Sequence, residues 1–119
     1  MKTLIKEQGL VVGVVSNADG RVESYLKGAG LWELFDFVLD SHLVGVEKPD
    51  PRIFEMALAK ARVAARESLY VGDLYQVDVV GARSAGLFPV LMDPLMADEY
   101  QDVARVRNVE DLARRILVD

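Results

Sequence analysis

Residues 69–78 read LYVGDLYQVD, an apolar stretch that ends in Gly-Asp and is followed by a second aspartate five residues later. Residues 11–17 read VVGVVSN and likewise lead from an apolar run into polar side chains, Ser-Asn. Residues 47–51 read EKPDP, where a lysine precedes a proline that can open a helix. Short apolar runs bounded by turn residues are typical of strands buried on both faces of a sheet. The three stretches therefore predict two buried strands and one helix start, each with polar groups beside it.

Strands and helices are predicted to alternate along the chain. Apolar runs indicate the strands, and apolar side chains at three- and four-residue steps indicate the helices. The expected strands are residues 10–15, 35–39, 69–71 and 88–92, and the expected helices are residues 3–8, 19–29, one that starts at 49 or 50, 76–85 and 109–117. Such alternation implies right-handed crossovers and an α/β fold with a parallel sheet covered by helices on both faces.

Polar groups follow most of the predicted strands. These groups are Ser16-Asn17, Asp40, Gly72-Asp73 and Asp93. In open parallel sheets the ligand site lies at the carboxyl ends of the strands, so these groups should gather at one edge. Lys48 precedes the helix after the second strand and can reach the same edge. We therefore expect the serine, the lysine and the two aspartates of residues 69–78 to converge there.

The residue types at this edge suit a phosphate and a metal ion. The Ser16 hydroxyl and the backbone N–H groups around Asn17 can donate hydrogen bonds to phosphate oxygens. Lys48 is a point charge that can neutralise a phosphoryl oxygen. Asp73 and Asp78 offer the hard oxygen ligands that Mg²⁺ prefers. The sequence thus predicts a site for phosphate transfer.

The order and spacing of the three stretches resemble the second, third and fourth motifs of the haloacid dehalogenase superfamily. Residues 30–41, GLWELFDFVLDS, and residues 48–58, KPDPRIFEMAL, are similar to the family's sequence between those motifs. The resemblance implies a three-layer, Rossmann-like core and Mg²⁺-dependent hydrolysis of a small phosphomonoester. The roles it implies are catalysis for Lys48, phosphate binding for Ser16, Asn17 and Lys48, and metal binding for Asp73 and Asp78.

The family's first motif has no counterpart before Val11. That motif is an Asp-x-Asp that supplies the nucleophile, and its strand forms the centre of the family's sheet. The cap that screens substrates has no counterpart either. Three explanations stay open: the chain is the C-terminal part of a longer enzyme, it is a reduced homologue that binds phosphate, metal or a partner without turnover, or a second polypeptide completes the site. In each case we expect this chain alone to be inactive.

A sheet without its central strand has two inner edges with unpaired backbone groups. Exposed edges pair readily with other chains, so we expect a homo-oligomer or a strand swap that closes the gap. A receiver-type module also alternates strands and helices, but its acidic residues come from early strands, whereas the first strand here ends in Ser-Asn. We therefore rank that alternative below the haloacid dehalogenase fold.

Composition sets the outer limits of the function. With 119 residues the chain is expected to form one small, partial core domain over residues 1–119. The net charge of −5 gives no overall attraction to nucleic acid or anionic membranes. The absence of cysteine excludes disulfides and thiolate metal sites. The first ten residues lack a continuous apolar core, unlike a signal peptide, so we expect a cytoplasmic protein.

Overall fold

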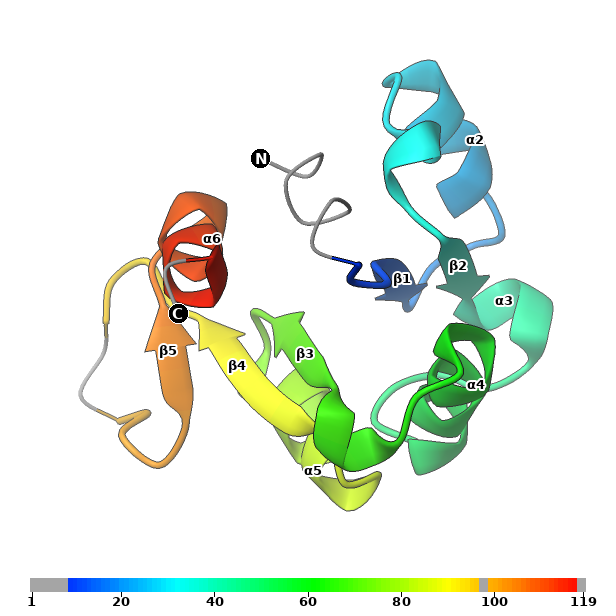
Figure 1. Ribbon diagram of the computed structural model, residues 1–119. Helices are drawn as coiled ribbons and strands as arrows, with labels where there is room; N and C mark the ends of the chain where they lie inside the picture. The colour runs from blue at the N-terminus through cyan, green and yellow to red at the C-terminus, as the bar shows by residue number, and fades with distance from the viewer. Residues whose placement is uncertain (1–8, 97–98, 118–119) are drawn as a thin grey trace.

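The structure is a computed structural model that describes residues 9–96 and 99–117. Strands and helices alternate through this part of the chain (Figure 1). The strands are β1 (Gly13–Ser16), β2 (Phe37–Asp40), β3 (Leu69–Gly72), β4 (Phe88–Met92) and β5 (Ala104–Val106). The helices are α2 (Val22–Gly28), α3 (Ser41–Val44), α4 (Pro51–Ala61), α5 (Val80–Ser84) and α6 (Val109–Leu117), with shorter helical turns at Trp32–Leu34, Ala65–Glu67 and Tyr75–Val79. The helix predicted over residues 3–8 lies outside the described residues.

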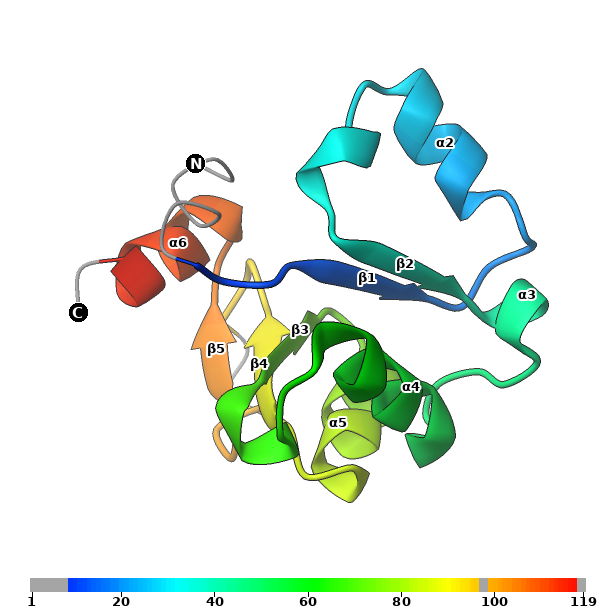
Figure 2. The same cartoon turned by 45° about the vertical axis from the view of Figure 1, so that its right-hand side comes forward.

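The strands form two parallel sheets. β1 pairs with β2, and β3, β4 and β5 pair in that order. Figure 2 shows β1 and β2 running side by side, apart from the three other strands. Every pairing is parallel, as predicted. Within the described residues no strand ladder joins β1 to β3, which is the arrangement expected of a sheet that lacks its central strand.

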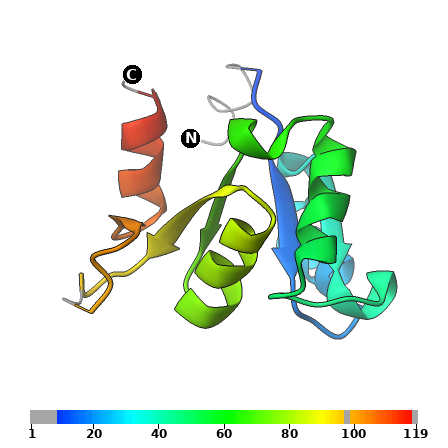
Figure 3. The same cartoon turned by 90° about the horizontal axis from the view of Figure 1, so that it is seen from below.

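Helices cover the strands from more than one side. α2 and α4 lie on opposite faces of the β1–β2 sheet in Figures 1 and 2, and both contact that sheet. Seen from below in Figure 3, α4 flanks β1, whereas α5 flanks the strands of the second sheet. α4 also packs on α5. Through these contacts, α4 and α5 link the β1–β2 sheet to the β3–β5 sheet.

The core is built around α4. Its apolar stripe was predicted from the spacing, and Ile53, Phe54 and Ala57 are indeed buried. They cluster with Leu39 of β2 and with side chains from the second half of the chain. Gly81 in α5 lies so close to the Phe54 ring that a Cβ there would overlap it. Burial of each large side chain contributes about 1.5–3 kcal/mol, so this cluster holds α4 against the β1–β2 sheet and against α5.

Asp40 explains why α2 begins later than the predicted residue 19. The carboxylate at the end of β2 accepts hydrogen bonds from the N–H groups of Gly20, at 3.1 Å, and Val22, at 3.3 Å. It also accepts from the N–H of His42, at 3.0 Å, and so caps α3. Because this buried carboxylate fixes the residues before α2 in a bend, the helix starts only at Val22.

The helix predicted over residues 76–85 is divided. A π-helical turn, η3 (Tyr75–Val79), precedes the short α5. Asp78 lies inside this turn, where its N–H donates to the carbonyl of Leu74 at 2.7 Å. Its carboxylate accepts from the N–H of the same residue at 3.1 Å. The first of these bonds has the ordinary helical spacing of four residues, whereas the second lets the buried Asp78 side chain satisfy the Leu74 N–H at the start of the turn.

Two elements were not predicted, α3 and β5. Each is a single turn or a three-residue strand, too short to show a period in the sequence. Among the described residues, no helix is both long enough and apolar enough to cross a membrane.

Candidate functional site

The polar groups predicted to gather do end neighbouring strands. Ser16 ends β1 and pairs in register with Asp40, which ends β2. Asp73 directly follows β3, and the loop between α3 and α4 carries Lys48. Within each sheet the carboxyl ends of the parallel strands point the same way. Lys48 links the two sheets at these ends, because Asn17 holds its backbone and its ammonium contacts Tyr70 and Asp78.

Asn17 holds the backbone of Lys48. Its side-chain oxygen accepts from the Lys48 N–H at 2.8 Å, and its side-chain nitrogen donates to the Lys48 carbonyl at 3.0 Å. The two residues are 31 positions apart in the chain. This pair of hydrogen bonds fixes the lysine loop against the end of β1.

The ammonium of Lys48 is held as firmly as its backbone. Nζ lies 2.8 Å from Oδ1 of Asp78 and 3.0 Å from the hydroxyl of Tyr70. The Lys48 and Asp78 side chains are only 12% and 4% exposed. Burial alone would lower the pKa of Lys48, but its hydrogen bonds to Asp78 and Tyr70 outweigh burial and raise that pKa above its usual value. The lysine therefore stays charged inside the fold.

Both oxygens of Asp78 are engaged. Oδ1 accepts from Lys48, and Oδ2 accepts from the N–H of Leu74 at 3.1 Å. Gly72 makes room for this carboxylate, because a Cβ at that position would overlap the Asp78 side chain. The glycine of the Gly-Asp pair is thus required by the close approach of the second aspartate.

Asp73 differs from Asp78 in every respect that matters for a metal. It is exposed, and its carboxylate makes no hydrogen bond or ion pair within the described residues. No group of three or more acids, histidines or cysteines suited to a metal ion occurs among those residues. Mg²⁺ often takes one or two carboxylates and completes its shell with water and phosphate. Asp73 fits such a ligand, whereas the Asp78 oxygens are occupied by protein donors.

A family model described as haloacid dehalogenase-like hydrolase matches residues 1–92, which include Ser16, Lys48, Asp73 and Asp78. The chain belongs to this family. A haloacid dehalogenase-like hydrolase domain-containing protein 3 from Bos taurus is 46% identical in a 99-residue alignment, and the match covers 78% of this chain and 39% of that protein. A phosphoserine phosphatase from Thermus thermophilus is 38% identical over 115 residues, which are 96% of this chain and 46% of that protein.

The fold is shared with a solved structure as well. The crystal structure of a HAD phosphatase from Thermococcus onnurineus superposes with a TM-score of 0.89 at 27% identity. It covers 97% of this chain and 54% of the other. The chain therefore spans about two fifths to one half of the length of these haloacid dehalogenase-like relatives.

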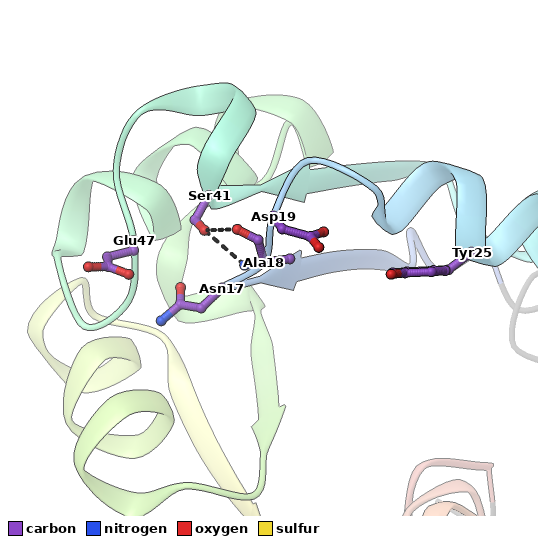
Figure 4. A pocket seen from close by; sticks show the side chains of 6 residues that line it. All are labelled: Asn17, Ala18, Asp19, Tyr25, Ser41 and Glu47. Atoms are coloured by element: carbon purple, nitrogen blue, oxygen red, sulfur yellow. Dashed lines mark hydrogen bonds between the residues drawn. The ribbon is translucent and has the colours of Figure 1, made fainter.

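Beside the lysine loop of this haloacid dehalogenase-like chain lies an open pocket of about 490 Å³. Figure 4 shows its lining, which consists of Asn17, Ala18, Asp19, Tyr25, Ser41 and Glu47. The Ser41 hydroxyl holds the backbone of Ala18, whose N–H donates to it at 2.9 Å. The pocket thus adjoins the residue that follows Ser16-Asn17.

Two side chains that contact the predicted residues were not predicted from the sequence. Ser41 holds the loop after β1, and Tyr70 contacts Lys48, yet neither was singled out. The only available signal for Tyr70 was a polar hydroxyl within an otherwise apolar strand. The predicted Ser16 is half-buried, and its hydroxyl makes no hydrogen bond within the described residues. The structure therefore joins Asn17, Lys48 and Asp78 by direct contacts and leaves Ser16 and Asp73 available.

Proposed function

We propose that this chain supplies the phosphate-binding and lysine-bearing part of a Mg²⁺-dependent phosphomonoesterase. The observation that carries this proposal is the Lys48 ammonium, held 2.8 Å from Asp78 beside the end of β1. A charge fixed in this way can neutralise a phosphoryl oxygen without reorganising during the reaction. The phosphoserine phosphatase among the relatives supports a small phosphate ester as the substrate class.

The proposed roles follow from which groups are engaged. The Ser16 hydroxyl has no protein partner in the described residues and can donate to a phosphate oxygen. Asn17 uses its amide on the Lys48 backbone, so it would contribute to phosphate binding by placing the lysine loop. Lys48 would meet the phosphate through its remaining N–H donor. Together these groups would hold the non-reacting oxygens of the ester.

We propose Asp73 as the Mg²⁺ ligand of this chain. Its exposed carboxylate directly follows β3, and waters and substrate phosphate would supply the other ligands. Mg²⁺ would neutralise charge on the transferred phosphoryl group. Asp78 was also predicted to bind metal, but its oxygens contact Lys48 and Leu74. We propose that it serves the site by orienting the lysine.

The nucleophile is proposed to come from elsewhere. Among the described residues, Asp78 is the only carboxylate that contacts the Lys48 ammonium, and both of its oxygens are engaged. Family chemistry needs a free aspartate in line with the phosphorus. We therefore expect the 119-residue chain alone to bind phosphate without hydrolysing esters.

Two measurements on the purified chain test this proposal. Calorimetric titration with inorganic phosphate should detect binding that strengthens when Mg²⁺ is added. Asp73→Asn should remove the Mg²⁺ effect, whereas Glu33→Gln, an exposed acid before β2 at the far end of the strand, should retain it. Turnover of p-nitrophenyl phosphate by the chain alone, abolished by Asp73→Asn, would show that the site is already complete. No phosphate binding at all would overturn the phosphate assignment.

A second candidate function is that of a partner-binding module, and the division of the sheet favours it. β1 and β3 each leave one edge without a strand partner in the described residues. We propose that another strand, from a second copy or a different polypeptide, inserts there and completes the site. Sedimentation velocity should then show a dimer at micromolar concentration. A monomer with a single cooperative unfolding transition would argue against insertion of a second copy.

A further inference from the structure

Tyr70 lies where three parts of the site meet. Its hydroxyl accepts a hydrogen bond from Nζ of Lys48 at 3.0 Å. The same oxygen lies 3.3 Å from Oδ1 of Asp78 and 3.3 Å from the carbonyl oxygen of Val15. A phenol has one proton, so it can donate to only one of these two acceptors at a time. In either state the hydroxyl stays in contact with the lysine.

The hydroxyl also spans the interval between the two sheets. Tyr70 belongs to β3 and Val15 to β1, two strands that share no ladder. The core sets the direction of the ring, since Tyr70 packs edge-on against Phe54 with centroids 4.9 Å apart and an interplanar angle of 84°. Phe54 is itself fully buried. The position of the hydroxyl is therefore fixed by packing rather than by the lysine.

A lysine needs such a fixed acceptor. Its ammonium sits on a flexible four-carbon stem and has three donors. Asp78 and Tyr70 take two of them, and the Tyr70 ring centroid lies 5.6 Å from Nζ, within reach of a cation–π attraction. One donor remains for a ligand. Without the hydroxyl, the ammonium could turn about its bond to Asp78.

We propose that Tyr70 is a positioning residue, whose hydroxyl aims the Lys48 ammonium and ties it to the end of β1 next to Ser16. Asn17 fixes the lysine backbone to β1, and Tyr70 fixes the side-chain end to the same strand. The distance between the serine and the ammonium is then set at both ends of the lysine. This inference rests on the proposed function, because the aimed ammonium is the group that would meet the phosphate.

The test compares Tyr70→Phe with Tyr75→Phe, a control whose hydroxyl contacts Asp102 and Arg83 rather than Lys48. Both variants keep the ring. Nitrogen-15 NMR of the lysine ammonium groups should show a slowly exchanging Lys48 signal in the wild type and in the control, but not in Tyr70→Phe. Inorganic phosphate should bind Tyr70→Phe roughly three- to tenfold more weakly, the net effect of one ordinary hydrogen bond.

The two readouts separate this inference from the proposed function. An unchanged Lys48 signal and unchanged phosphate affinity in a folded Tyr70→Phe variant would overturn the role of Tyr70. If the wild type binds no phosphate, the proposed function fails, while the Lys48 signal still decides whether Tyr70 positions the lysine.

A reciprocal experiment covers the case in which Tyr70→Phe does not fold. In protein labelled with 3-fluorotyrosine, Lys48→Met should move the fluorine signal of Tyr70. The matched control is Lys60→Met, which removes an exposed lysine of α4 and should leave that signal in place. A Tyr70 signal that ignores the loss of Lys48 would overturn the inference.

Discussion

The two aspartates of residues 69–78 lie five positions apart, yet their surroundings are opposite. Asp78 is buried, with both oxygens bonded to protein donors, whereas Asp73 is exposed and has no partner in the described residues. The difference separates what the fold completes by itself from what it leaves open. The contacts around Lys48 are complete within the described residues, whereas Asp73, the proposed Mg²⁺ ligand, would need further ligands from solution or from another segment.

The largest loss of stability is expected from neutralising Asp78, the aspartate that pairs with Lys48. Asp78→Asn should lower the free energy of unfolding by about 3–5 kcal/mol, because it leaves the nearly buried Lys48 ammonium without its counter-charge. Asp73→Asn should change it by less than about 0.5 kcal/mol. Urea unfolding at pH 7 measures both. Equal losses in the two variants would show that the two aspartates do not differ as described.

The double variant Lys48→Met with Asp78→Leu sharpens the same comparison. Replacing both members of a buried ion pair by apolar groups is often neutral or stabilising, so this variant should recover most of the loss seen in Asp78→Asn. If it stays as unstable as Asp78→Asn, the unpaired lysine is not the cause of the loss in Asp78→Asn.

A smaller loss is expected from Gly72→Ala. The added Cβ would overlap the Asp78 carboxylate, which is held on both sides, so overpacking should cost about 1–3 kcal/mol. Gly28→Ala is the matched control, because a Cβ at the end of α2 meets nothing within 4 Å. It should be neutral or slightly stabilising in thermal unfolding. A Gly72→Ala variant as stable as the control would mean that Asp78 can move aside.

Alkaline pH should gradually reduce the stability that Lys48 and Tyr70 contribute to the fold. The pKa of Lys48 is raised in the fold by Asp78 and Tyr70 despite burial, and burial raises the pKa of Tyr70 more than the ammonium lowers it. Both groups keep their protons longer when folded than when unfolded. Their contribution is therefore complete below about pH 10 and is lost as pH rises through the folded-state pKa values. Urea midpoints between pH 8 and pH 11 should fall less steeply in Tyr70→Phe than in the wild type.

The smallest effect is expected at an ion pair outside this network. Arg21 and Asp19 form a salt bridge at 2.5 Å, but their side chains are 66% and 51% exposed. Water screens such a pair, so Asp19→Asn should leave the urea midpoint almost unchanged. Urea unfolding of Asp19→Asn and Asp78→Asn under the same conditions measures the difference in stability between the two variants. A loss of several kcal/mol here would contradict the link between burial and stability on which the comparison rests.

Prediction from the sequence succeeded where the signal was a continuous apolar run or a helical period. The strand over residues 88–92 and the helix over residues 109–117 have the predicted bounds, and the α4 stripe is buried as expected. The π-helical turn η3 was missed because Asp78 bonds to Leu74 and reaches Lys48, 30 positions away. Contacts over such separations leave no period in the sequence.

The candidate site shows the same distinction between positions that the sequence could predict and contacts that it could not. Motif order was enough to predict that Lys48 and Asp78 share an edge, since strand ends fix positions in a parallel sheet. It was not enough to predict which side chains would bond there. The pairing of Asp78 with Lys48 and the hydroxyl of Tyr70 depend on rotamers and packing, which only the folded chain determines.

In the two hydrogen bonds between Asn17 and Lys48, the side-chain amide of Asn17 donates one and accepts the other, as a backbone peptide group would. The backbone of Lys48 is therefore bonded to the residue after β1 as if it were paired with a neighbouring strand. Aspartate has the acceptor but no donor, and glutamine is one methylene too long for the same pair of hydrogen bonds. The requirement for asparagine here is architectural, so we expect even a catalytically silent relative of this chain to need it for the loop to close.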